Sequence, residues 1–109
     1  MTAFGRLLRS ALENRGWTQR GAAGHLGVSH GFLNLLMSGK RTPPIDQVDA
    51  WASALRLAGE QRRRFSDLAA LAHLPEAVRE RFEAFYDEHL QLRDDYAELL
   101  KQVRRVAER

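Results

Sequence analysis

Catalysis or metal binding in this chain would depend on histidine and acidic side chains, because the sequence contains 4 histidines, 14 acidic residues and no cysteine. The lack of cysteine excludes a thiol nucleophile, a disulfide and a thiolate metal site. The histidines fall on separate predicted elements: His25, His30, His73 and His89. His25 and His30 also lack the i, i+4 spacing of a helical zinc pair. A solvated helix face accounts for the neighbouring carboxylates Glu80, Glu83, Asp87 and Glu88. We therefore expect no metal site, no cofactor and no enzyme activity.

The side chains that do suggest a binding chemistry lie in one stretch between Thr18 and Pro43. Two short helices joined by a tight turn must position them. The first helix begins after Thr18, whose hydroxyl can accept from the exposed N–H groups of the first turn. It ends at Gly27, because glycine readily adopts the left-handed conformation found at helix C-termini. Ser29 then caps a second helix that extends to about Met37. The pattern predicts a helix-turn-helix.

The same stretch resembles the helix-turn-helix of the Cro and phage-repressor (XRE-like) type. The resemblance rests on an ordered set of residues: Thr18-Gln19, Ala23, Leu26-Gly27-Val28-Ser29, Leu33, Gly39-Lys40-Arg41 and Pro43. With the flanking helices it covers residues 3 to 57, half of the chain. It implies a protein that binds double-stranded DNA by placing the second of the two helices in the major groove.

The resemblance also implies how individual residues contact DNA. Early residues of the second helix read base edges, and those that face outward are Ser29, His30, Gly31, Phe32 and Asn34. Asparagine can form two hydrogen bonds with adenine, and histidine can donate or accept at a purine edge, so His30 and Asn34 are the principal candidates. Phe32 has two alternatives, contact with a thymine methyl group or packing on the protein core. The implied phosphate contacts are Thr18, Gln19, Lys40 and Arg41.

Length and charge agree with a small DNA-binding protein. A chain of 109 residues accommodates one domain and an appended element, and we place these at residues 1–73 and 74–109. Residues 1–72 carry 10 basic and 5 acidic side chains, whereas residues 73–109 carry 7 and 9. A basic first part suits a polyanion. Without a run of apolar residues long enough to span a membrane, and without a signal peptide, we expect a cytoplasmic protein. No small-molecule ligand is evident.

Three further helices complete a predicted all-α, five-helix domain of the lambda-repressor-like kind. An apolar stripe at i, i+3, i+4, i+7 and i+8 marks the first of them: Phe4, Leu7, Leu8, Ala11 and Leu12. A fourth helix should begin near Ile45 and end by Gly59, and a fifth should extend from Glu60 to Ala72. Successive helical residues point in different directions, so we interpret Arg62-Arg63-Arg64 as a solvated face and not as one basic stripe.

The C-terminal part has a heptad pattern. Its positions recur with alternating spacings of four and three residues: Val78, Phe82, Phe85, His89, Leu92, Tyr96, Leu99, Val103 and Val106. Such a repeat is typical of a coiled coil. We expect one long helix beginning at Leu74-Pro75 and covered by a second copy, which predicts a homodimer. The alternative is two shorter helices that fold together, with a break at Asp94-Asp95, where Asp95 and Glu98 resemble a capping box.

The function we expect is that of a dimeric, sequence-specific transcription regulator. With no effector domain visible, it would act as a repressor by occluding a pseudo-palindromic operator. The alternative is an antitoxin-like interaction module, whose C-terminal helix binds a different protein and whose DNA binding serves autoregulation. A stable dimer formed by the chain alone would favour the first function over the second.

Overall fold

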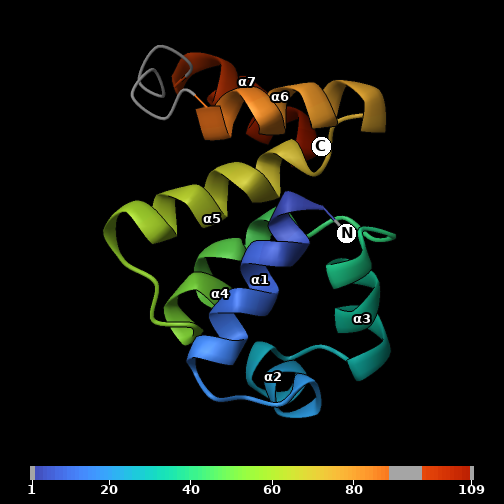
Figure 1. The fold of residues 1–109 in the computed structure, drawn as a ribbon, viewed down its shortest axis with the longest axis vertical. Coiled ribbons are helices and arrows are strands. Elements are labelled where there is room, and N and C mark those ends of the chain that lie inside the picture. Colours follow the sequence, from blue (N-terminus) through green and yellow to red (C-terminus); the bar gives the residue numbers. More distant parts are fainter. Residues whose placement is uncertain (1, 89–96, 109) are drawn as a thin grey trace.

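The computed structural model describes residues 2–88 and 97–108, and in these residues the only regular structure is helical (Figure 1). The helices are α1 (Ala3–Asn14), α2 (Gln19–Leu26), α3 (His30–Ser38), α4 (Val48–Ala54), α5 (Gly59–Leu71), α6 (Glu76–Glu88) and α7 (Ala97–Ala107). Helices α1 to α5 form one bundle, and α6 and α7 both lie on α5. The predicted all-α class is therefore confirmed for the described residues.

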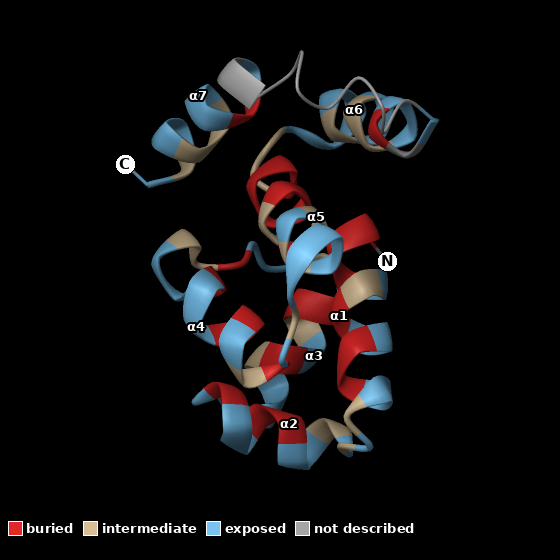
Figure 2. Cartoon of the chain, turned by 90° about the vertical axis from the view of Figure 1, so that its left-hand side faces the viewer, coloured by how far each residue is buried: buried red, intermediate tan, exposed pale blue. Residues whose placement is uncertain are grey.

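The apolar stripe of α1 lies at the centre of the bundle. Phe4, Leu8, Ala11 and Leu12 are buried, and Leu7 packs against them from a half-buried position. The aromatic ring of Phe4 lies 5.0 Å from that of Phe65 on α5, measured between centroids. Because α1 contacts both α3 and α5, this stripe connects the helix-turn-helix to the C-terminal half. Figure 2 shows the buried residues concentrated where these helices face one another.

Within the bundle, the predicted and observed ends differ most for α4. Residues Ile45–Gln47 form a single 3-10 turn with no side-chain cap, and the α-helix begins only at Val48. The preceding Pro44 is extended, with φ −68° and ψ 117°, and therefore lies outside the helix. The helix also ends before Gly59, because Arg56 adopts a left-handed φ of 56° after the C-cap residue Leu55.

The single long C-terminal helix is not what the structure contains, and this prediction was wrong. One helix from Val78 to Val106 would be about 42 Å long at 1.5 Å per residue, whereas α6 and α7 both pack on α5, a helix of 13 residues. The described residues instead form α6 and α7, two separate helices as in the alternative. The expected break at Asp94-Asp95 lies outside the described residues.

The physical reason is that α5 offers a face large enough to cover both helices. Tyr86 of α6 and Leu100 of α7 are buried, and each follows directly after an expected coiled-coil position, Phe85 or Leu99. Phe85 and Leu99 are 41% and 39% exposed. The periodicity was therefore correct, but the buried face is displaced by one residue and packs within the same chain.

Polar contacts of Asp67 and Glu83 hold this C-terminal helix pair, α6 with α7, on the bundle. Asp67 of α5 is 2% exposed. Its carboxylate accepts a hydrogen bond from the Tyr86 hydroxyl at 3.0 Å and forms an ion pair with Arg104 of α7. Glu83 of α6 accepts at 3.3 Å from the backbone N–H of Ala3, at the start of α1. The helix pair is thus anchored to two helices of the bundle.

Candidate nucleic-acid interface

The two helices of the predicted helix-turn-helix are α2 and α3, and their caps are those read from the sequence. The Thr18 hydroxyl accepts from the N–H of Gly21 at 3.0 Å, and the Ser29 hydroxyl accepts from the N–H of Phe32 at 3.0 Å. Gly27 ends α2 in the left-handed conformation, with φ 72° and ψ 30°. The turn between the helices is therefore fixed by local hydrogen bonds and by one glycine.

Core contacts then decide which face of α3 is exposed. Leu33, Leu36 and Met37 are buried against the bundle. On the α2 side, the indole N–H of Trp51 donates to the carbonyl oxygen of Leu26 at 3.1 Å in a buried position, which ties the end of α2 to α4. With both helices held from inside, the opposite face of α3 remains available to a ligand.

That outward face carries the polar residues expected to read bases. His30, Gly31 and Asn34 are exposed, as is the cap residue Ser29. Phe32 is half-buried and packs on the core, which favours the packing alternative for this side chain while leaving part of its ring accessible.

The structure also joins two predicted site residues that the sequence did not connect. The side-chain amide of Gln19, at the start of α2, donates to the side-chain oxygen of Asn34 at 3.3 Å. This bond restrains the orientation of the Asn34 amide, leaving its NH₂ group free to donate outward. Gln19 therefore positions a base-reading candidate, in addition to the phosphate contact expected of it. Gln19 and Asn34 are fifteen residues apart and lie on different helices, so the sequence did not indicate that they are in contact.

Gly31 occupies open space on the exposed face of α3. A Cβ atom built there meets no protein atom within 4 Å. Glycine inside a helix costs about 1 kcal/mol relative to alanine, and no contact within the described protein compensates for that cost. The residue is therefore not explained by packing, and it leaves the helix backbone open to close approach from outside.

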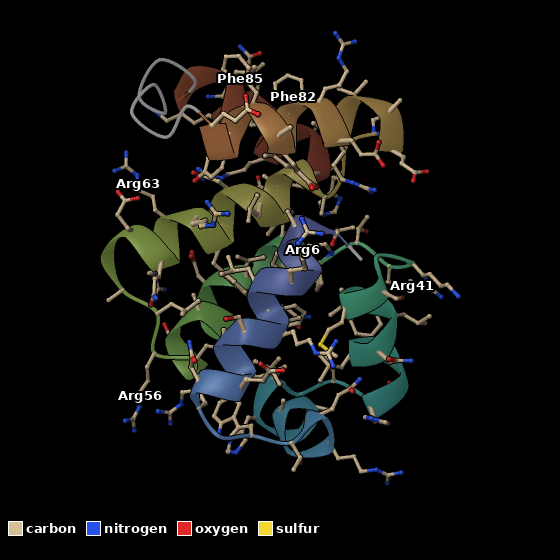
Figure 3. All side chains as sticks on the ribbon, viewed as in Figure 1. Arg6, Arg41, Arg56, Arg63, Phe82 and Phe85 are labelled. Atoms are coloured by element: carbon tan, nitrogen blue, oxygen red, sulfur yellow. The ribbon has the colours of Figure 1, made fainter. Side chains whose placement is uncertain are left out.

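Lys40 and Arg41 are exposed directly after α3, in a loop with a defined path. Both backbone N–H groups bond to the carbonyl oxygen of Leu35, at 2.9 and 3.2 Å. Gly39, at φ 85°, precedes them, and a Cβ there would lie 2.6 Å from the Thr2 side chain. Figure 3 shows Arg41 projecting outward from the end of α3.

The same loop is anchored further along by a residue that sequence reasoning did not assign to the site. The imidazole Nε2 of His73 lies 2.7 Å from the carbonyl oxygen of Pro43, and Pro43 is itself buried. His73 is remote in sequence and follows α5, so only the folded chain brings it to the loop that carries Lys40 and Arg41.

Four arginines of the C-terminal half of the bundle lie on other surfaces. Figure 3 shows Arg56 and Arg63 on the side of the molecule opposite Arg41. In the expected solvated run, Arg62 donates to Ser53 on α4, and the guanidinium of Arg64 lies 5.7 Å from the centre of the Tyr86 ring. These arginines therefore point in different directions and form no basic stripe with Lys40 and Arg41.

The expected dimerisation residues are only partly brought together. Val78, Phe82, Phe85 and Leu99 line one apolar groove of about 370 Å³ between α6 and α7, with Arg81 at its edge. Val106 is 67% exposed, and Val103 is half-buried. His89, Leu92 and Tyr96 lie outside the described residues.

Two further features of the described residues bear on what the molecule binds. None of their helices combines the length and the apolar character that a membrane crossing requires. Within the same residues, no group of three or more histidine and acidic side chains has a geometry suited to a metal ion.

Comparison with known proteins agrees with the geometry of α2 and α3. A family model described as a helix-turn-helix domain matches residues 3–65, which is more than half of the chain and includes α1 to α4 entirely. Comparisons with curated proteins and with solved structures gave no match. Domains of this type place the second helix of the motif in the major groove of DNA. Residues at the two ends of the motif contact the phosphate backbone of the DNA. The chain belongs to the helix-turn-helix domain family.

Proposed function

We propose that the protein is a sequence-specific DNA-binding transcription regulator, with α3 as its recognition helix. The observation that carries this proposal is the exposed face of α3, where His30, Gly31 and Asn34 adjoin one another and Gln19 restrains the Asn34 amide. Asparagine and histidine offer donors and acceptors matched to purine edges in the major groove. Lys40 and Arg41 at the end of the helix, and Thr18 and Gln19 at the start of α2, contact phosphates on either side.

We propose further that the protein acts as a dimer on a pseudo-palindromic operator and represses transcription by occluding the promoter. One helix-turn-helix reads only a few base pairs, so useful specificity needs two copies on half-sites about 34 Å apart. Repression by occlusion requires no effector domain in addition to the DNA-binding dimer.

A selection of bound duplexes from random DNA tests the central proposal. We expect an enriched motif with two inverted half-sites, bound at least about 10³-fold more tightly than unrelated DNA at physiological salt. The protein for comparison is the double variant His30→Ala with Asn34→Ala, which should keep the fold but no longer select the enriched motif. Equal binding of all duplexes by the unmodified protein would contradict the proposal.

The second candidate is an antitoxin-like module that binds a different protein. The observation that favours it is the apolar groove between α6 and α7, because exposed apolar patches mark interaction sites. In that case the regulator's DNA binding would serve to control its own synthesis. The oligomeric state of the isolated chain separates the two candidates.

A further inference from the structure

The N-terminus of the chain lies against the loop of residues 39–43, which carries Lys40 and Arg41 (Figure 1). Thr2 is buried, with 9% of its surface exposed. A Cβ atom on Gly39 would lie 2.6 Å from Cγ2 of Thr2 and 3.6 Å from its backbone nitrogen. The methyl group of Thr2 therefore packs directly on the backbone of Gly39. This contact holds the start of the loop from outside α3.

Helix α6 in turn holds the N-terminus in this place. The Thr2 hydroxyl caps α1 by accepting at 2.9 Å from the N–H of Gly5. The next backbone N–H, that of Ala3, donates at 3.3 Å to Oε2 of Glu83 on α6. The other oxygen of Glu83 lies 3.4 Å from Nε of Arg79, and the two side chains are only 12% and 16% exposed. Because a carboxylate is favoured at a helix N-terminus, Glu83 anchors the segment that contacts the loop.

The other end of the loop is held by His73, at the junction of α5 and α6. Its Nε2 atom lies 2.7 Å from the carbonyl oxygen of Pro43. A carbonyl oxygen can only accept, so Nε2 is the donor in this bond. Pro43 is itself buried. The loop is therefore held at Gly39 and at Pro43, on either side of its two cations.

We propose that Thr2 and His73 are positioning residues for DNA binding, which hold the two cations of the loop where they meet phosphate groups. This inference rests on the proposed function, because the loop is the phosphate contact in that proposal. Glu83 acts one step further away, through the N-terminus. All three residues lie outside residues 3–65, the part of the chain that the helix-turn-helix family model matches. Residues beyond the family domain therefore contribute to the DNA affinity of this protein.

Two measurements follow the position of the loop, one with DNA and one without. Lys40 and Arg41 release counterions only where they reach the DNA backbone, so a displaced loop weakens the salt dependence of binding. It also binds phosphate less tightly, because more conformational freedom is lost on binding. Without DNA, the backbone N–H groups of the same two residues report the loop directly. Both donate to the carbonyl oxygen of Leu35, at 2.9 and 3.2 Å, and their hydrogen exchange measures how often these bonds open.

Two substitutions of Thr2 separate its contact with the loop from its role as a helix cap. Thr2→Ser removes the methyl group that packs on Gly39 and keeps the hydroxyl that caps α1. It should lower the slope of log affinity against log salt by about one unit. Exchange of the Lys40 and Arg41 amides should accelerate about tenfold. Thr2→Val keeps the methyl group and loses the cap, so it should lower the melting temperature more, and the slope less, than Thr2→Ser does.

His73 and Glu83 are each tested with a matched variant. His73→Leu should lower the slope as Thr2→Ser does, and His73→Gln should restore it, because the glutamine amide can donate from near the position of Nε2. Glu83→Ala should act in the same direction as Thr2→Ser. Glu80→Ala removes an exposed carboxylate from the same helix and should keep the slope of the unmodified protein.

A mutant cycle with the loop cations decides whether the positioning residues act through them. In the protein that carries Lys40→Ala with Arg41→Ala, neither Thr2→Ser nor His73→Leu should lower the slope further. A further decrease would overturn the proposal, because it would show an effect independent of the loop. A lower melting temperature with an unchanged slope, for both variants of the otherwise unmodified protein, would overturn it as well.

Hydrogen exchange of the loop amides separates this proposal from the proposed function. If exchange accelerates in Thr2→Ser and His73→Leu but the unmodified protein binds no selected duplex specifically, the proposed function fails and the two residues still position the loop. If the unmodified protein binds an operator specifically and neither variant changes the exchange or the slope, the positioning role fails and the function stands.

Discussion

The hydrogen bond between Gln19 and Asn34 restrains the side chain that we propose contacts a base. Asn34 is exposed, and an unrestrained amide would lose side-chain entropy each time it bound. The Gln19 donor, 3.3 Å from the Asn34 oxygen, reduces that loss by holding the amide plane before DNA arrives. The oxygen keeps a second lone pair for an adenine amino group, so both hydrogen bonds to adenine remain possible.

We predict that Asn34→Ala will relax discrimination at particular base pairs by roughly 1–3 kcal/mol, the scale of a good base contact. Gln19→Ala should relax the same positions by a smaller amount, because it removes the restraint and leaves the reading group in place. Binding to a set of single-base operator variants measures both effects. Uniform weakening on every sequence would show that Asn34 does not read bases.

Gly31→Ala separates stability from binding at one position. Open space around the missing Cβ and an ordinary helical backbone predict that alanine raises the free energy of unfolding by about 0.5–1 kcal/mol. If the backbone of α3 approaches DNA closely at this point, the same methyl group should weaken operator binding. Thermal unfolding and operator affinity, measured on one preparation, test the two effects. An unchanged affinity would place Gly31 away from the DNA surface.

Residue-level features differed in how far they were predictable. The caps Thr18 and Ser29 and the left-handed Gly27 follow from local chemistry, which sequence displays directly, and the structure confirms all three. The contacts Gln19–Asn34 and His73–Pro43 join distant residues. Their side chains have no property that marks them as partners, so only the folded chain identifies them.

The loop after α3 behaves as a fixed element and not as a flexible tail. Backbone bonds from Lys40 and Arg41 to Leu35 close its start, and the His73 contact with Pro43 holds its end. Two cations on a restrained loop lose little backbone freedom when they bind phosphate. This favours them as backbone contacts that set the position of the whole recognition helix.

Replacing Lys40 and Arg41 by alanine should weaken specific and non-specific DNA binding alike. Each lost phosphate contact should lower the slope of log affinity against log salt by about one unit, because fewer counterions are released on binding. The matched control is Arg56→Ala with Arg63→Ala, which removes two cations from the opposite side of the molecule. If the control and the test variant have the same slope, Lys40 and Arg41 do not contact DNA.

At the scale of elements, periodicity predicted the helices better than their partners. The α1 stripe lies in the core as expected, and α2, α3 and α5 begin and end close to the predicted residues. The heptad of the C-terminal part predicted helical structure correctly, but it predicted one continuous helix where the described residues form α6 and α7. A repeat of apolar residues does not distinguish an intramolecular partner from a second copy, and here α5 buries Tyr86 and Leu100.

The arrangement of the whole molecule depends on how firmly the C-terminal helix pair is attached. Its apolar contacts would allow several orientations, whereas the Asp67 carboxylate accepts from groups on two helices at once. A buried acidic residue is costly unless it is fully bonded, so this contact favours one orientation over its neighbours. The division into residues 1–73 and 74–109 stays a prediction.

Replacing Asp67 by asparagine should loosen the helix pair before it affects the bundle. The amide can still bond to Tyr86, but it loses the ion pair with Arg104, whose side chain is 33% exposed and therefore partly screened. We expect the free energy of unfolding to fall by roughly 1–3 kcal/mol. Amide hydrogen exchange should accelerate in α6 and α7 while α2 and α3 stay protected.

Tyr86→Phe provides the graded control, because it removes one hydroxyl and leaves the ion pair between Asp67 and Arg104 intact. Its effect on hydrogen exchange should be smaller and confined mainly to α6. If the proposed dimer forms through the helix pair, the Asp67→Asn protein should also bind operators whose half-sites are one base pair closer or further apart. The unmodified protein should discriminate against both spacings, because rigid attachment fixes the separation. Equal discrimination by the two proteins would show that contacts other than Asp67 maintain the orientation of the dimer.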